Sequence, residues 1–243
     1  MSDARQQLLS LLAKESFRLG QFKLSSGGTS DYYIDCRTTT LHAEGARLCG
    51  RVFLDEIRHQ DWSPKAIGGL TMGADPIVVS VAMQSAQEAQ AHTQASGEEF
   101  LIHGFLVRKA EKQHGMGQRI EGFREKGTKV VIMDDVCTTG ASTIQAIEAA
   151  REFGFEVVGV MCLVEREEAH GRPAVEVAAA GVPFVAIFTA SDVRAEHIRQ
   201  NPEAVKSLPT TFVVAAKCDF CDRPAVTNVP GPRCEVHRSE GAE

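Results

Sequence analysis

The sequence contains no apolar run long enough to span a membrane, and residues 1–10 lack the basic start and apolar stretch of a secretory signal. It has no tract of biased composition, and its 43% hydrophobic and 24% charged residues exclude disordered and fibrous folds. Basic residues are in deficit, with 26 Lys and Arg against 32 Asp and Glu, for a formal net charge of -6. We therefore expect a cytoplasmic globular protein that does not bind the nucleic-acid backbone, and in which local groups bind any anionic ligand.

Two common nucleotide-binding fingerprints are also missing, because neither GxxxxGK nor GxGxxG occurs in the chain. The sequence instead alternates strand-like apolar runs with helical or turn segments. The apolar runs cover residues 66–70, 100–107, 129–133, 157–164 and 182–188, and the first helical segments cover residues 4–19, 42–60 and 75–94. This alternation predicts an α/β fold with a mainly parallel sheet flanked by helices. Ligands of such sheets bind at the carboxyl ends of the strands.

The two ends of the chain depart from this pattern. Residues 22–37, FKLSSGGTSDYYIDCR, indicate two short strands around a Ser/Gly-rich turn, which we interpret as a hairpin hood. The alternation stops after about Leu208, where the composition changes to Cys, Pro, Asp and Arg. We therefore expect a main domain of residues 1–208, including a hood within about residues 1–40, and a small C-terminal module of residues 209–243.

The strongest local pattern is KVVIMDDVCTTGAST at residues 129–143. A buried-strand run ends in Asp134 and Asp135, whose carboxylates can accept hydrogen bonds from ribose hydroxyls and help to hold a metal-bound sugar. A loop of small residues then opens a helix, whose N-terminal N–H groups can bind a phosphate. The alternative is that the two acids only end a strand and that Thr139 or Ser142 caps an ordinary helix.

A second segment, VRKAEKQHGMGQRIE at residues 107–121, places four potential cations after a strand and close to two glycines. The four are Arg108, Lys109, Lys112 and His114. They suit a lid that closes over a leaving group whose negative charge grows as it departs. The alternative is a solvated basic turn.

Together, the acid pair with its loop, the basic segment and the hood segment resemble the orotate phosphoribosyltransferases over about residues 8–188. The acid pair with its loop matches the motif for 5-phosphoribosyl 1-diphosphate (PRPP) of type I phosphoribosyltransferases. The resemblance implies the type I fold and transfer of phosphoribosyl from PRPP to orotate, which gives orotidine 5'-monophosphate and pyrophosphate in de novo pyrimidine (UMP) synthesis. It also implies Mg²⁺ bound with PRPP, and a homodimer whose lid residues reach the neighbouring active site.

The resemblance also assigns residue roles. Lys112, Asp134 and Asp135 are the expected catalytic residues. The expected PRPP contacts are Thr71, Met72, Gly73, Arg108, Lys109, Lys112, His114, Asp134, Asp135, Val136, Cys137, Thr138, Thr139, Gly140, Ala141 and Ser142. The expected orotate contacts are Tyr33, Ile34, Thr138 and Arg166, the last suited to the substrate's carboxylate.

Two positions depart from the family pattern. Ser25 stands where many members have Lys, and a second family Lys aligns with Met72 and Gly73. We infer that residues 71–74 offer backbone N–H groups to pyrophosphate instead. Two other functions remain open at this stage: a type I transferase for another base, and a PRPP-sensing regulator that has lost turnover and binds nucleic acid through its tail.

The seven cysteines fall into two groups. Cys36, Cys49, Cys137 and Cys162 are scattered, and in a reducing compartment we expect Cys49 and Cys162 to be small buried hydrophobes. The tail holds CxxC-x12-CxxH, formed by Cys218, Cys221, Cys234 and His237. This pattern predicts a zinc-ribbon-like module with structural Zn²⁺ in four-coordinate geometry. The alternatives are a redox pair at Cys218 and Cys221, and a tail without metal.

Overall fold

The computed structural model describes residues 3–23, 29–92, 101–109 and 119–203. The turn of the predicted hood, the centre of the predicted lid, the boundary at Leu208 and the predicted zinc module lie outside the described residues. The chain divides into two compact units. Of the described residues, those within 3–17 and 34–197 form the larger unit, and those within 18–33 and 198–203 form the smaller.

The larger unit is built on a six-stranded sheet with the strand order β5-β4-β3-β6-β7-β8. The strands are β3 (Ala66–Leu70), β4 (His103–Val107), β5 (Ile120–Gly122), β6 (Lys129–Cys137), β7 (Glu156–Glu165) and β8 (Phe184–Thr189). All neighbours pair in parallel except β4 and β5, which are antiparallel. The predicted, mainly parallel sheet is therefore confirmed, and every residue of its central strand β3 is buried, as expected for a sheet covered on both faces.

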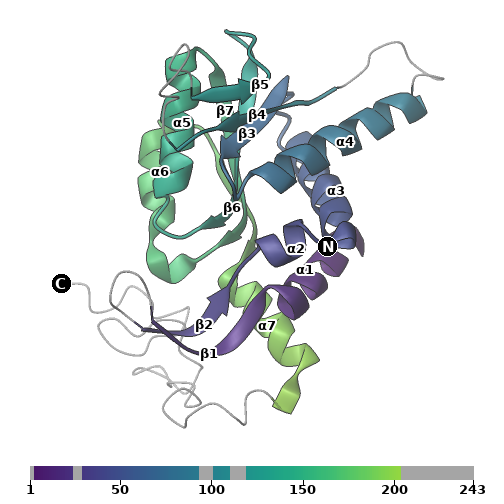
Figure 1. Cartoon of the computed structure of the whole chain (residues 1–243), viewed down its shortest axis with the longest axis vertical. Helices are drawn as coiled ribbons and strands as arrows, with labels where there is room; N and C mark the ends of the chain where they lie inside the picture. Colours follow the sequence, from purple (N-terminus) through teal and green to yellow (C-terminus); the bar gives the residue numbers. More distant parts are fainter. Residues whose placement is uncertain (1–2, 24–28, 93–100, 110–118, 204–243) are drawn as a thin grey trace. The chain divides into compact units, whose positions relative to one another are not determined.

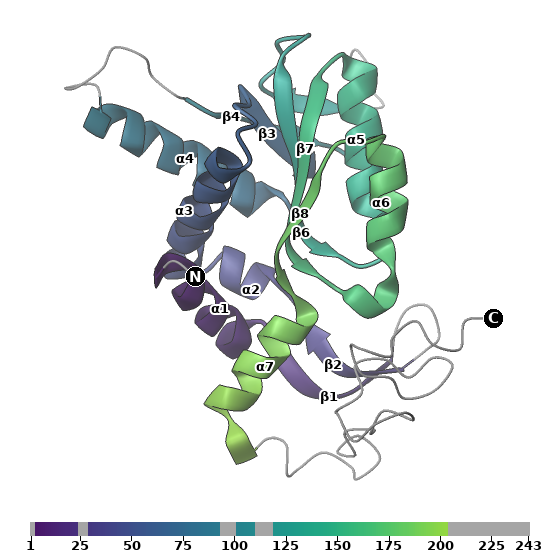
Figure 2. The ribbon, with the colours of Figure 1, turned by 180° about the vertical axis from the view of Figure 1, so that it is seen from behind.

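Helices cover both faces of this sheet. The helices are α1 (Asp3–Glu15), α2 (Arg37–Thr40), α3 (Ala43–His59), α4 (Asp75–His92), α5 (Ala141–Phe153), α6 (Gly171–Ala179) and α7 (Ala190–Gln200), with a 3-10 turn η1 (Glu167–Ala169). Figure 1 and Figure 2 show α5 and α6 on one face and α4, backed by α3, on the other. Under α5 and α6 the core includes Phe105, Ile132 and Phe155. No helix in the described ranges has the length and apolarity needed to cross a bilayer.

The predicted helices at residues 42–60 and 75–94 are confirmed as α3 and α4, with ends that differ by at most two residues. Other boundaries differ more. Strand β4 begins at His103, three residues after the predicted start at residue 100. Helix α1 ends at Glu15, because the backbone from Phe17 pairs with another strand instead of continuing the helix. Strand β6 runs to Cys137, four residues beyond the predicted end, because its pairing with β7 continues through Asp134 and Val136.

The scattered cysteines are all free and buried, which confirms the expectation for Cys49 and Cys162. Burial raises the pKa of the Cys49 thiol to about 12. This thiol is therefore protonated at neutral pH and behaves as a small apolar side chain.

The smaller unit contains most of a two-stranded sheet formed by β1 (Phe17–Lys23) and β2 (Thr29–Ile34). The two predicted strands are present, but β1 begins five residues before the predicted segment of residues 22–37. Within it the rings of Phe22 and Tyr33 lie 5.5 Å apart, and Tyr33 is 48% exposed. The sheet thus presents an aromatic side chain to its surroundings.

Candidate active site

The two adjacent carboxylates at the end of β6 have different surroundings. Asp134 is only 5% exposed, and both of its oxygens accept hydrogen bonds: Oδ2 from the Thr143 hydroxyl at 2.7 Å and Oδ1 from the Asp135 N–H at 3.0 Å. Asp135 is half-buried, and its Oδ1 accepts from the Val136 N–H at 2.9 Å. Asp134 therefore ties the end of β6 to α5, whereas Asp135 is the carboxylate that a ligand can reach.

Burial also changes the ionisation of this pair. It raises the pKa of Asp134 to about 7, and the neighbouring Asp135 charge adds to the rise, while the Thr143 hydrogen bond opposes it. The pKa of Asp135 is also raised, mainly by burial, and the Val136 N–H and the positive charge of Arg37 lower it in part. The protein thus keeps two carboxylates in close contact at an electrostatic cost.

This cost predicts a pH-dependent stability. In the unfolded chain Asp134 ionises near its ordinary pKa of 3.8, and in the fold near 7, so the native state binds more protons between these values. Its contribution to the free energy of unfolding should fall as the pH rises from about 4 to about 7 and level off above that. Asp134→Asn removes this titration. In urea unfolding, the free energy of unfolding of the variant should therefore rise relative to that of wild type as the pH increases across this window.

The half-buried Asp55 on α3, which pairs with Arg51, offers a matched control for the loss of one acidic side chain through Asp55→Asn. Parallel stability curves for Asp134→Asn and wild type would show that Asp134 ionises in the fold as it does in the unfolded chain.

The loop after β6 has the geometry of a phosphate-binding helix start. Gly140 caps α5 with a φ of 78°, in the left-handed region where glycine is the residue without a Cβ penalty. The first N–H groups of a helix have no partner inside it, and Thr139, Ala141 and Ser142 are exposed there. The side chain of Cys137 lies in the core, so a ligand contact at this position would use its backbone. This loop can bind an anion with N–H groups and hydroxyls and without a large positive charge.

The loop after β3 approaches the same carboxylates. A Cβ at Gly73 would lie 2.3 Å from Oδ1 of Asp135, so glycine leaves the room that this carboxylate occupies. The Thr71–Met72 peptide bond is cis. The Thr71 N–H donates to the Val107 carbonyl at 2.9 Å, and the Ala74 N–H donates to the Leu70 carbonyl at 3.4 Å. Of the N–H groups expected to bind pyrophosphate, those of Met72 and Gly73 are therefore the ones without a hydrogen bond in the described chain.

A cavity of about 540 Å³ opens beside this loop, lined by Thr71, Met72, Leu106, Arg108, Lys109 and Glu121. Arg108 and Lys109 follow β4, as predicted for the base of the lid. The Arg108 N–H donates to the Arg119 carbonyl at 2.9 Å, and its guanidinium lies 3.6 Å from Glu121. Both ends of the lid segment thus meet at this cavity, while Lys112 and His114 lie outside the described residues.

The structure places the predicted orotate contacts in different surroundings. Arg166 follows β7, its N–H donates to the Cys137 carbonyl at 2.9 Å, and its guanidinium pairs with Glu168 at 2.8 Å. A Cβ at Gly171 would lie 2.1 Å from the Thr138 carbonyl, so the turn after Arg166 touches the phosphate loop. The Ile34 side chain is buried, so a ligand contact there would use its backbone. Tyr33 belongs to the smaller unit.

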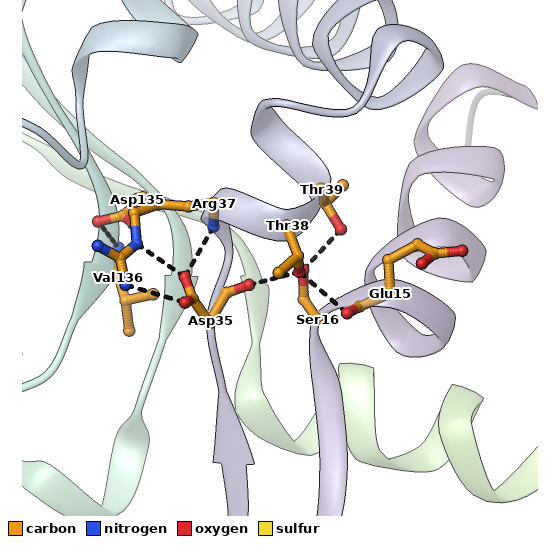
Figure 3. Close-up of polar contacts among 8 residues, drawn as sticks. All are labelled: Glu15, Ser16, Asp35, Arg37, Thr38, Thr39, Asp135 and Val136. Atoms are coloured by element: carbon orange, nitrogen blue, oxygen red, sulfur yellow. Dashed lines mark hydrogen bonds and ion pairs between the residues drawn. The ribbon is translucent and has the colours of Figure 1, made fainter.

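Two residues beside the acid pair escaped prediction. Thr143 fixes Asp134, and the positive charge of Arg37, which Figure 3 draws in the same close-up as Asp135, lowers the pKa of Asp135 in part. Thr143 could have been found, because a hydroxyl in the first turn of a helix is a frequent partner for an acid just before it. Arg37 lies 98 positions from Asp135 in the sequence, so only the fold brings the two together.

Comparisons with known proteins agree with this geometry. The family described as phosphoribosyl transferase domain matches residues 39–178. The orotate phosphoribosyltransferase of Aquifex aeolicus is 38% identical over 192 residues, which are 78% of this chain and 97% of that protein. The chain belongs to the orotate phosphoribosyltransferase family.

Other members support the same placement. The orotate phosphoribosyltransferase of Rhodopirellula baltica is 42% identical over 163 residues, 65% of this chain and 79% of that protein. The crystal structure of the Mycobacterium tuberculosis enzyme in complex with Fe(III) dicitrate superposes with a TM-score of 0.63 at 34% identity, covering 78% of this chain and 98% of that chain. The family thus accounts for the mainly parallel sheet flanked by helices.

Proposed function

We propose that the protein transfers the 5-phosphoribosyl group from PRPP to orotate, giving orotidine 5'-monophosphate and pyrophosphate, as a step of de novo pyrimidine (UMP) biosynthesis. The observation that carries this proposal is the end of β6. There the accessible Asp135 carboxylate, the loop that opens α5 and the loop after β3 converge on one place, as a phosphorylated ribose requires. Membership of the orotate phosphoribosyltransferase family is the reason to propose orotate as the acceptor base.

In this reaction the bond from ribose C1 to the pyrophosphate oxygen breaks, a bond from C1 to a pyrimidine nitrogen forms, and the proton of that nitrogen is released. Because C1 becomes cationic as the first bond stretches, no protein nucleophile is needed. The loop from Thr138 to Ser142 binds the 5'-phosphate, Asp135 accepts hydrogen bonds from the ribose hydroxyls, and Asp134 holds the loop in place. Catalysis then consists of aligning the two substrates and stabilising the charge of the leaving group.

Pyrophosphate would lie in the cavity near Arg108 and Lys109, with Lys112 and His114 closing over it from the lid. Mg²⁺ would enter with PRPP, held by the oxygens of the substrate, and would supply positive charge to the leaving group. The oxygen-rich surroundings of Asp135 fit such a hard cation. Met72 and Gly73 contribute N–H groups where other members use a lysine side chain.

Orotate would contact Arg166 through its carboxylate and Thr138 through its ring, with Tyr33 and Ile34 covering it. Because Arg166 now pairs with Glu168, orotate must replace that carboxylate when it binds. The enzyme acts as a cytoplasmic homodimer in this proposal, since lid residues that reach a neighbouring site complete it.

The proposal is tested by mixing purified protein with PRPP, Mg²⁺ and orotate and following the loss of orotate absorbance, with uracil, hypoxanthine and adenine assayed in parallel. Turnover with orotate alone supports it. Turnover with another base alone would retain the PRPP site and replace the acceptor. Binding of PRPP without turnover of any base would indicate a PRPP-sensing regulator, which a steeply salt-dependent affinity for nucleic acid would support.

We further propose that Cys218, Cys221, Cys234 and His237 hold a structural Zn²⁺ in the C-terminal module. The alignment covers 97% of the Aquifex protein but 78% of this chain, so about a fifth of this chain is unmatched, which is room for an appended module. Four Cys and His ligands form a closed site with no position for a substrate. Elemental analysis should therefore find one zinc per chain, and Cys218→Ser with Cys221→Ser should lose it while orotate turnover persists. Cys36→Ser in the core should keep the zinc, and wild-type protein free of zinc would exclude the site.

A further inference from the structure

The guanidinium of Arg166 is held by the carboxylate of Glu168. Nε of Arg166 donates to Oε1 of Glu168 at 3.0 Å, and Nη2 lies 2.8 Å from the same oxygen. The Arg166 side chain is 13% exposed, whereas that of Glu168 is 50% exposed. A guanidinium with so little access to water is costly to leave without a carboxylate. Some carboxylate should therefore face Arg166 whether or not a substrate is bound.

The backbone on both sides of Arg166 is seated on the phosphate loop. The Arg166 N–H donates to the Cys137 carbonyl at 2.9 Å, and the Ala169 N–H closes η1 by donating to the Arg166 carbonyl at 3.0 Å. At the far end of the turn, a Cβ at Gly171 would lie 2.1 Å from the Thr138 carbonyl oxygen. The Arg166 side chain therefore extends from a backbone that is fixed beside this loop.

The two acidic side chains of η1 have different partners. Oε2 of Glu167 accepts hydrogen bonds from the Ser191 N–H at 3.3 Å and from the Ser191 hydroxyl at 3.2 Å, which tie η1 to α7. Glu168, the next residue, holds Arg166 and has half of its side chain in solvent. The Glu168 side chain can therefore turn away from Arg166 while Glu167 keeps the backbone of η1 in place.

A second pair of arginine and glutamate at the end of β7 is built differently. Nε of Arg172 donates to Oε1 of Glu165 at 2.8 Å and to Oε2 at 3.1 Å, and its Nη1 donates to the Phe184 carbonyl at 3.2 Å. The Glu165 side chain is only 9% exposed, so this pair is a structural link from α6 to β7 and β8. Of the two pairs, that of Arg166 is the one whose carboxylate a ligand can replace.

We propose that Glu168 is a positioning residue that holds Arg166 in the free enzyme, yields it to the carboxylate of orotate and takes it back as orotidine 5'-monophosphate leaves. This inference rests on the proposed function, which assigns the carboxylate of orotate to Arg166. A ligand that brings a carboxylate has to displace Glu168, whereas a ligand without one leaves the pair intact. Glu168 therefore weakens the binding of carboxylated ligands alone, which favours release of the product.

The test compares two ligands that differ only in the carboxylate, orotidine 5'-monophosphate and uridine 5'-monophosphate. Their Kd values are measured by calorimetry on the full-length chain. Glu168→Gln should lower the Kd of orotidine 5'-monophosphate about fivefold, the upper end of the range for an ion pair with an exposed partner, and should leave the Kd of uridine 5'-monophosphate unchanged. In the Arg166→Gln background, Glu168→Gln should change neither value, because the guanidinium for which the two carboxylates compete is gone.

Glu176→Gln is the matched control, because Glu176 on α6 is 51% exposed, pairs with Arg172 at 3.5 Å and should leave both Kd values unchanged when it is neutralised. Two results for Glu168→Gln would overturn the inference: an unchanged or raised Kd of orotidine 5'-monophosphate, or an equal change for both ligands, which would mean that the charge acts on the phosphate. If wild type binds both ligands equally, the proposed assignment of Arg166 fails and the inference fails with it. If wild type prefers orotidine 5'-monophosphate, Glu168→Gln judges the inference alone.

Discussion

Replacing Lys112 by alanine should lower kcat for orotate turnover by about 10²- to 10³-fold, the loss typical of removing one group that stabilises charge in a transition state. The described flanks of the lid give the reason. Residues 107 and 120 pair across β4 and β5, and the Arg108 N–H is bonded to Arg119, so the segment between them starts and ends at the cavity of Arg108 and Lys109. Lys112 comes three residues after Lys109 and is the central cation of that segment.

Because the charge of pyrophosphate grows as its bond to ribose breaks, a cation that closes over it acts more on the transition state than on bound PRPP. The loss should therefore appear mainly in kcat, with a smaller change in KM for PRPP. The control is Lys126, which lies on the turn before β6 with its ammonium over the ring of Phe153. Lys126→Ala should retain wild-type turnover. Equal turnover by Lys112→Ala and wild type would contradict a catalytic role for Lys112.

The sequence predicted the sheet and its loops well, because both depend on local patterns. Apolar runs mark strands buried on two faces, and the acid pair with its small-residue loop marks a strand followed by a helix start. It could not show which of the two acids is buried. Successive residues in a strand point to opposite faces, so one of Asp134 and Asp135 had to face inward. The choice depends on Thr143 and on the packing of α5.

The contacts that joined separate segments were also beyond local patterns. The charge of Arg37 acts on Asp135 from α2, which is anchored to the end of α1 through hydroxyls whose residue types are common in loops of any kind. The extra length of β6 likewise depends on its pairing with β7. Such contacts are set by tertiary structure, and their residues carry no periodicity that distinguishes them from solvated positions.

The turn after Arg166 supports the phosphate loop so closely that a single methyl group should disturb both folding and binding. In Gly171→Ala the new Cβ would lie 2.1 Å from the Thr138 carbonyl oxygen and 2.9 Å from the Gly140 nitrogen, and both atoms belong to the backbone of that loop. Because no flexible side chain can give way, the loop or α6 must shift. We expect the free energy of unfolding to fall by about 1–3 kcal/mol, the usual cost of overpacking. We also expect a weaker affinity for PRPP.

The two effects can be separated by measuring urea unfolding and PRPP binding on the same variant. Val177, 81% exposed on the same helix, provides the control, because Val177→Ala adds no atom near the loop and should change neither quantity. If only stability falls, α6 has moved and the loop has kept its geometry. If the PRPP affinity falls as well, at a temperature where the variant is fully folded, the loop has moved, and its backbone is the phosphate site. An unchanged stability together with an unchanged affinity would contradict the close packing of Gly171 against Thr138.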